Sequence, residues 1–189
     1  MANSSDPAIC AAPLPIPVDL FLSKKHPDHV TTSSGNIIFR LSRQSLKSSS
    51  IDKIVLHDAA AAAAAAGPLI SIHRVNKESW QGFKGDIGEQ DLLFKVERTL
   101  NKLRRTEFKV FLVGENSDDS NASLEMKGFP FQRSCTIYKG NTIVAQTSLM
   151  HKLHQICVRR GRFRLTIFPG TVDPSLIVAL IVIFFDGRI

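Results

Sequence analysis

The feature that most constrains the fold of this chain is a run of ten apolar residues near its C terminus, residues 176–185. As an α-helix the run spans about 15 Å, half of the roughly 30 Å of bilayer hydrocarbon, so a membrane-spanning helix is disfavoured. A buried β-strand is an alternative, because several of these residues are β-branched. The flanking residues favour a helix, since Asp173 is a good N-cap, Pro174 suits the first helical position and Gly187 suits a left-handed C-terminal cap.

The rest of the chain consists of short runs rich in Val, Ile, Phe and Thr, separated by Gly, Asn, Asp and Ser. In EFKVFLV (107–113) and RFRLTIF (162–168), every second residue is apolar, which is typical of a strand with one buried face. Many short strands at such intervals predict an antiparallel all-β sandwich or barrel. The runs are VDLFLS, NIIFRLS, KIVLHD, PLISIHRV, DLLFKVER, EFKVFLV, FQRSCTIYK, NTIVAQT and RFRLTIF.

A helix that is apolar on every side must be surrounded on every side. In a chain otherwise composed of strands, only a curled sheet can surround it, so the predicted fold is an all-β barrel with a central buried helix. The residues predicted to form this core helix are Pro174, Leu176, Ile177, Val178, Leu180, Ile181, Ile183 and Phe184.

The composition and the positions of glycine and proline predict one domain over residues 15–189. A disordered segment with several prolines is predicted over residues 1–14. Gly35, Gly67 and Gly140 each precede an apolar pair, which predicts three hairpins whose glycines have positive φ. The eight alanines at 59–66 fall in the second of these connections. They are interpreted as a low-complexity expansion of a surface loop, where each doubling of length costs only about 0.6 kcal/mol.

The net charge of +7 is concentrated in one segment. Residues 126–172 contain eight Lys or Arg and no Asp or Glu, whereas the other 142 residues contain sixteen basic and seventeen acidic side chains. If RRGRFRLTIF forms a strand, Arg160, Arg162 and Arg164 share one face at a spacing of about 6.6 Å. Guanidinium groups in such a row suit phosphate groups, and an anionic leaflet attracts each basic residue by about 1 kcal/mol.

The predicted anion- or lipid-binding residues are therefore Lys152, Arg159, Arg160, Arg162 and Arg164. The alternative is that outward positions of a soluble barrel simply require charge. Nucleic acid is a disfavoured partner, because aromatic residues are not interleaved with the cations on the same face.

Several segments, in order, resemble a known family. They are PVDLFLSKK, GNIIFRL, IVLHDA with GPLISI, SWQGFKGD, DLLFKVER, KGFPFQRSCTIYKGN with TIVAQ, and VDPSLIVALIVIFFDGRI. Together they resemble the plant LURP-one-related proteins, relatives of the tubby C-terminal domain and the phospholipid scramblases. The resemblance covers almost the whole chain from about residue 15, and it implies a barrel of about twelve antiparallel strands around the C-terminal helix.

The resemblance also implies a link with plant defence, and it relates the chain to proteins that bind membranes or act as membrane-tethered transcription regulators. Tubby domains bind phosphoinositide headgroups through basic side chains on the barrel, but their binding residues do not match this sequence position by position, so no site transfers. The leading hypothesis is a non-enzymatic, defence-linked module that binds phosphoinositide or other anionic headgroups. The alternative is a protein-binding adaptor or membrane-tethered transcription regulator that does not bind lipid.

Chemical sites have little support in the sequence. The motifs GxSxG, GxGxxG, HExxH and the P-loop do not occur, and no cofactor is expected. His151, His154 and Cys157 lie at three-residue intervals, which on a strand points them to opposite faces, so no metal site is predicted. The three cysteines form no CxxC pair and are expected to be free thiols, with Cys135 and Cys157 as small core residues. We expect a monomer without a transmembrane segment, in the cytosol or nucleus or peripheral at the inner membrane surface.

Overall fold

The structure is a computed structural model that describes residues 16–23, 27–45, 52–59, 67–85, 91–101, 105–114, 122–149, 162–170 and 172–185. Along these residues it contains twelve β-strands, one α-helix and a short 3₁₀ turn. The strands are β1 (Val18–Ser23), β2 (His29–Thr31), β3 (Ile37–Ser45), β4 (Asp52–Asp58), β5 (Ile70–Arg74), β6 (Ser79–Lys84), β7 (Leu92–Asn101), β8 (Thr106–Leu112), β9 (Leu124–Phe129), β10 (Ser134–Lys139), β11 (Thr142–Leu149) and β12 (Arg162–Ile167). The 3₁₀ turn η2 is Pro130–Gln132 and the helix α1 is Pro174–Phe184.

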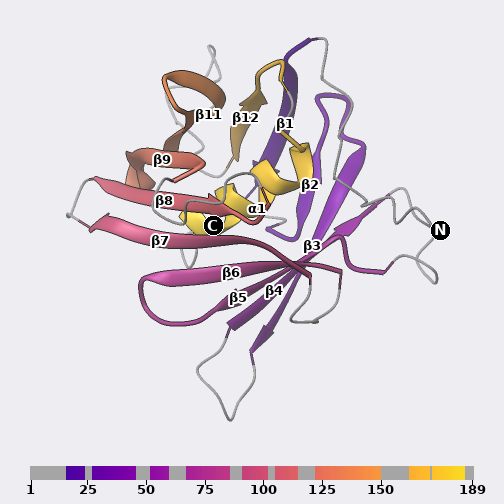
Figure 1. Cartoon of the computed structure of the whole chain (residues 1–189). Helices are drawn as coiled ribbons and strands as arrows, with labels where there is room; N and C mark the ends of the chain where they lie inside the picture. The colour runs from indigo at the N-terminus through magenta and orange to yellow at the C-terminus, as the bar shows by residue number, and fades with distance from the viewer. Residues whose placement is uncertain are drawn as a thin grey trace, which may run out of the picture.

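The strands form one closed, antiparallel barrel in which each strand pairs with its neighbours in the sequence. The first and last strands complete the ring, because β1 pairs with β12 from Val18 opposite Ile167 to Ser23 opposite Arg162. Figure 1 shows the strands arranged around α1, which is yellow. The predicted all-β barrel with a central helix is therefore confirmed.

The start of α1 has the caps that its sequence predicts. The carboxylate of Asp173 accepts hydrogen bonds from the backbone N–H of Ser175 at 2.7 Å and from its hydroxyl at 2.8 Å. Pro174 occupies the first turn, where its missing N–H costs no helical hydrogen bond. At the other end Phe185 is the C-cap residue, whereas Gly187 lies outside the described residues.

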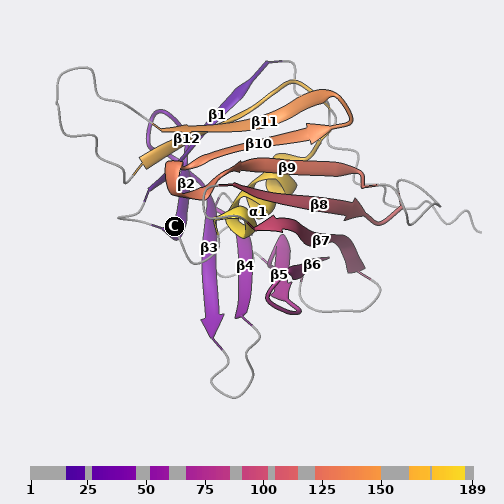
Figure 2. The ribbon, with the colours of Figure 1, turned by 90° about the vertical axis from the view of Figure 1, so that its left-hand side faces the viewer.

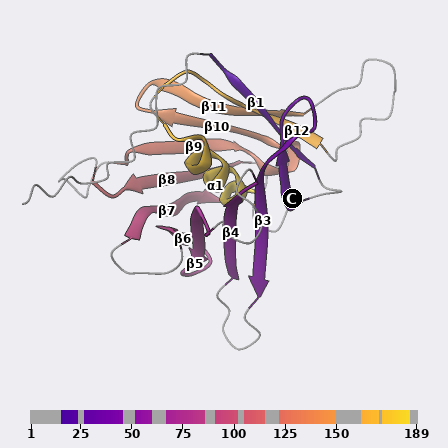
Figure 3. The same cartoon turned by 90° about the vertical axis from the view of Figure 1, so that its right-hand side faces the viewer.

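The core of the barrel is α1 itself together with the inward side chains of the strands. From residue 177 to residue 185 every side chain of the helix and its cap is at most 4% exposed. Figures 2 and 3, from two opposite sides, both show the helix running between the walls of the barrel. Of the predicted core residues, Pro174 and Leu176 are only partly buried, because they form the first turn. In the part of the chain that the structure describes, no helix has the length and apolar character needed to cross a bilayer.

Three strands lie outside the runs recognised in the sequence, namely β2, β6 and β9. The glycine prediction is confirmed at Gly35 (φ 91°) and Gly140 (φ 57°) and is wrong at Gly67, whose φ is not positive. The reason is the length of that connection, since β4 ends at Asp58 and β5 begins only at Ile70, so no tight turn is required. The predicted disordered segment 1–14 and residues 60–66 of the alanine tract lie outside the described residues.

Because α1 fills the barrel, a cavity in the helix should destabilise the whole protein. Leu180→Ala removes a side chain that is 0% exposed, and it should lower the free energy of unfolding by about 2–5 kcal/mol. Urea denaturation followed by far-UV circular dichroism measures this. Ile143→Ala, at a position that is 40% exposed, is the control and should change the stability by less than about 0.5 kcal/mol. Equal effects at the two positions would contradict a helix-filled barrel.

Candidate anion-binding face

Strand β12 has the two faces that its alternating sequence predicts. Phe163, Leu165 and Ile167 are at most 3% exposed and belong to the core cluster. Arg162 and Arg164, which alternate with these core residues, are exposed on the outer surface. Of the five residues predicted to bind anions, these two therefore share an exposed face. The other three, Lys152, Arg159 and Arg160, lie outside the described residues.

Strand β1 contributes an acid to this surface that sequence reasoning missed. The guanidinium Nη1 of Arg164 lies 3.6 Å from Oδ2 of Asp19, and the hydroxyl of Thr166 donates a hydrogen bond of 2.6 Å to Oδ1 of the same carboxylate. Thr166 and Asp19 are 147 positions apart in the sequence and become opposite residues when β1 closes on β12. Residues 126–172 contain no acid in the sequence, but in the folded structure Asp19 of β1 lies beside them.

The ion pair between Arg164 and Asp19 is weak enough for an anion to replace it. The two side chains are 47% and 40% exposed, and pairs this exposed contribute about 0–1 kcal/mol. A phosphate group offers Arg164 a stronger, bidentate partner than a single carboxylate oxygen at 3.6 Å. Asp19 thus reduces the positive charge of this surface without neutralising it.

Arg162 is held by an aromatic ring instead of an acid. Its guanidinium carbon lies 4.9 Å from the ring centroid of Phe21, which is on β1. Phe21 alternates with the core residues Leu20 and Leu22, so its ring belongs to the outer side of the barrel. Stacking uses the flat face of a guanidinium and leaves the N–H donors at its edge available for a phosphate. We call this surface, Arg162 and Arg164 with Asp19 and Phe21, the β12–β1 face.

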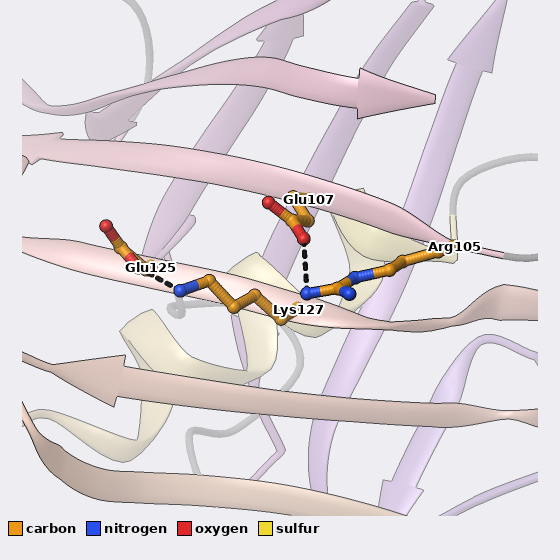
Figure 4. A network of polar contacts seen from close by, with 4 residues as sticks. All are labelled: Arg105, Glu107, Glu125 and Lys127. Carbon is orange, nitrogen blue, oxygen red and sulfur yellow. Dashed lines mark ion pairs between the residues drawn. The ribbon is translucent and has the colours of Figure 1, made fainter. Parts of the chain in front are cut away.

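The outer surface of β8 and β9 shows the opposite arrangement, because its cations are matched by acids (Figure 4). Arg105 pairs with Glu107 at 2.7 Å, and Lys127 pairs with Glu125 at 2.5 Å. In the strand register Glu107 lies opposite Lys127, and Glu125 lies opposite Lys109. The result is a checkerboard of alternating charges, in which the neighbouring acids offset most of the attraction for an anion.

Lys127 belongs to the basic segment but is engaged locally. Its hydrogen bond to Glu125 raises the pKa of the lysine and lowers the pKa of the carboxyl. The same Nζ lies 5.6 Å from the ring centroid of Tyr138, beside a shallow depression of about 430 Å³. The depression is lined by Ala122, Leu124, Glu125, Lys127, Tyr138, Gly140 and Asn141. The positive charge of the segment is therefore not uniform, and among the described residues it is exposed most openly on β12.

Arg133 also belongs to the basic segment, but its side chain is buried in the barrel. Its exposed fraction is 7%, and its guanidinium carbon lies 6.0 Å from the ring centroid of Phe163 and 5.6 Å from that of Phe185. Phe185 is the C-cap of α1, where the helix dipole is negative and a cation is favoured. The charge of Arg133 therefore lies at the negative end of the helix, and its burial keeps it out of an anion site.

Arg98, on β7, also packs against aromatic rings. Its guanidinium carbon lies 5.2 Å from the ring centroids of both Trp80 and Phe108. The Phe108 ring contacts Phe184 at 5.5 Å, and Phe184 contacts Phe185 at 5.2 Å. Together with Arg133 and Phe163, these residues form what we call the aromatic end of the barrel: Arg98, Arg133 and the rings of Trp80, Phe108, Phe163, Phe184 and Phe185. The sequence does signal Arg98, because it follows the buried Phe94 and Val96 in the strand alternation, and Trp80 itself lies in the core.

Other candidate groups give no chemical site among the described residues. Cys135 is a free thiol that is fully buried, and burial raises its pKa well above the usual value, so it is a poor nucleophile. Across the described ranges no three His, Cys, Asp or Glu side chains gather as a metal ion requires. His151, His154 and Cys157 lie outside those ranges.

Comparison with known proteins gives consistent results. The sequence profile of the LURP-one-related family matches residues 18–186. The chain is 47% identical to Protein LURP-one-related 7 of Arabidopsis thaliana over 178 residues, which covers 91% of each chain. It is 30% identical to Protein LURP-one-related 15 of the same plant, covering 96% of this chain and 83% of the relative. An X-ray structure of a protein from Arabidopsis thaliana is similar, with a TM-score of 0.67 and 30% identity over 97% of both chains.

The aromatic end should contribute to stability through the charge of Arg133. Arg133→Met keeps an unbranched side chain of similar length and should lower the free energy of unfolding by about 1–2 kcal/mol, because the cation–π and helix-dipole interactions are lost. Urea denaturation measures the loss, and Arg164→Met on the outer surface, as the control, should change the stability by less than about 1 kcal/mol. A variant Arg133→Met that is as stable as the original would mean that the cost of desolvating the guanidinium outweighs its contacts.

Proposed function

Because the chain belongs to the LURP-one-related family, we propose that it is a non-enzymatic binding module whose β12–β1 face engages anionic membrane headgroups, phosphoinositides included. The observation that carries the proposal is the exposure of Arg162 and Arg164 on one strand within 47 residues that contain no acid. A guanidinium group can bind a phosphate group through two parallel hydrogen bonds.

The expected affinity follows from the number of cations near the membrane. Each basic residue close to an anionic leaflet contributes about 1 kcal/mol, so Arg162 and Arg164 alone supply only about 2 kcal/mol. The segment 126–172 also contains Lys152, Arg159 and Arg160, which we propose as further contacts. The interaction is reversible and sensitive to salt, since charges are screened over about 10 Å at 0.1 M ionic strength.

An enzymatic role has less support. The hydroxyl of Ser42 and Nε2 of His57 lie 3.3 Å apart, which is the distance between a nucleophile and its base. Both side chains, however, alternate with the core residues Leu41 and Leu56, so they lie on the outer face of the barrel, where a convex surface does not enclose a substrate. The Cys135 thiol is buried. We therefore propose binding and not catalysis.

The place of this binding in the cell is a further part of the proposal. We propose that the protein acts at the inner surface of a membrane and serves plant defence, as the family resemblance implies. The alternative is a protein-binding adaptor or membrane-tethered transcription regulator that does not bind lipid. The two hypotheses differ in a single measurable property, namely affinity for anionic vesicles.

Co-sedimentation with vesicles tests the proposal directly. The protein should sediment with phosphatidylcholine vesicles that contain phosphatidylserine or a phosphatidylinositol bisphosphate, and should stay in solution with phosphatidylcholine alone. Arg162→Gln combined with Arg164→Gln removes about 2 kcal/mol, so the partition coefficient should fall by about 30-fold. Absence of sedimentation with any anionic vesicle would overturn the proposal in favour of the adaptor.

A matched control removes the same charge from another surface. Arg105→Gln combined with Lys109→Gln changes the checkerboard on β8, four strands from β12. Four strand spacings are about 19 Å along the sheet, almost twice the screening length at 0.1 M salt, so binding should fall much less. Asp19→Asn should act in the opposite direction and raise the partition coefficient about fivefold, because it releases Arg164 from its acid. Unchanged binding in Asp19→Asn would exclude Arg164 from the contact.

A further inference from the structure

Two phenylalanines protrude from the corner between β9 and β10. Phe129 is 40% exposed and Phe131 is 67% exposed, on either side of Pro130. Single exposed apolar residues are common on soluble proteins and need no explanation. Two aromatic rings within three residues at one corner are a different case, because together they expose a considerable apolar surface.

The corner holds the two rings on a rigid support. Pro130 is buried and begins η2, and the backbone N–H of Arg133 closes the turn onto the Pro130 carbonyl at 3.2 Å. Arg133 adopts a left-handed conformation (φ 53°), its carbonyl accepts a hydrogen bond of 3.0 Å from the Thr147 hydroxyl, and its side chain enters the aromatic end. Gly128 precedes the corner, and a Cβ there would overlap the carbonyl oxygen of Ser134. The exposed rings are thus positioned in advance, which lowers the entropy cost of binding.

The corner and the β12–β1 face lie at the same end of the barrel. The Arg133 guanidinium reaches 6.0 Å from the ring of Phe163, and Phe163 directly follows Arg162 on β12. Figures 2 and 3 agree, since in both the junction of β9 and β10 lies beside the beginning of β12. The exposed Val113 and Ile143, by contrast, follow the end of β8 and begin β11, at the opposite end of these strands.

We infer that Phe129 and Phe131 form a hydrophobic wedge that enters the headgroup and upper acyl region of an anionic membrane while the β12–β1 face binds its headgroups. This inference rests on the proposed function and names the second contact of the same site. A bilayer presents phosphate groups directly above apolar chains, which matches arginines beside protruding aromatic rings. Aromatic side chains favour this interface, and two weak signals together give stable attachment where one does not.

The composition of the corner favours a membrane over a protein groove. Phe129 and Phe131 lie within the 47 residues that carry eight cations and no acid, so the charge of this segment, even with Asp19 beside Arg164, favours an anionic surface. A bilayer surface is uniformly anionic and needs no shape complementarity to a convex corner, whereas a protein partner would need both an apolar pocket and an acidic surround.

Tryptophan fluorescence can report the insertion. The chain contains one tryptophan, Trp80, which is 1% exposed, so the signal of the original protein should not change with vesicles. In a Phe131→Trp variant, vesicles of phosphatidylcholine with phosphatidylserine should shift the emission to shorter wavelength, and brominated lipids should quench it. Phe129→Ser combined with Phe131→Ser should lower the partition coefficient by about tenfold or more, from the loss of apolar burial. Raising the salt concentration should weaken the vesicle binding of both the original protein and this double variant, and it should leave the ratio of their partition coefficients unchanged.

A control pair of similar exposure lies at the other end of the barrel. Val113 and Ile143 are 57% and 40% exposed, and Val113→Ser combined with Ile143→Ser should leave vesicle binding unchanged. Thermal unfolding checks that each variant is folded. If the original protein binds anionic vesicles but the double phenylalanine variant binds equally well, the two rings do not enter the membrane and the inference is overturned. If the original protein does not bind vesicles at all, the proposed function itself fails.

Discussion

The structure depends on the enclosure of one short helix that has no polar side. Residues 177–185 offer no face to water, so the helix is stable only when strands surround it completely. An open sheet would leave one side of α1 exposed, and closure through the pairing of β1 with β12 removes that exposure. Closure also removes the free sheet edges that would otherwise pair with other chains. The central helix and the closed ring therefore require one another.

Closure of the ring also determines the surface chemistry. It brings Asp19 and Phe21, near the start of the chain, against the arginines of β12 near its end. The acid moderates the charge of Arg164, and the ring orients Arg162. The same strand contributes Phe163 to the aromatic end, where Arg133 links the corner of β9 and β10 to the end of the helix. A single strand thus connects the core, the basic surface and the exposed aromatic corner.

The parts of the fold that local chemistry determines could be predicted from the sequence. The cap formed by Asp173 and Pro174 and the apolar run identify the helix, and the alternation in β8 and β12 identifies their buried faces. The missed strands lack such signals. Strand β2 has only three residues, whereas β6 and β9 are each interrupted by an inward glycine, Gly82 or Gly128, that accommodates a close neighbour.

The candidate site was less predictable because its important contacts are distant in sequence. The exposure of Arg162 and Arg164 follows from alternation alone, but the approach of Asp19 requires knowledge of the β1–β12 register. A count of charges along the chain does not distinguish Arg133 from the exposed basic residues of the same segment. Arg133 is buried because the ring of Phe163 on β12 and the ring of Phe185 at the end of α1 pack against it. Charge counted along the chain therefore overestimates the cations that an anion can reach.

Native-state amide hydrogen exchange tests most directly whether the barrel is built around its helix. If α1 is enclosed on every side, its amides can exchange only when the barrel opens globally. The free energy of exchange of the amides of residues 178–183 should then equal the global free energy of unfolding, and no strand should exceed it. Exchange from α1 at a clearly lower free energy than from the central strands would show that the helix leaves an intact barrel, and would contradict this account.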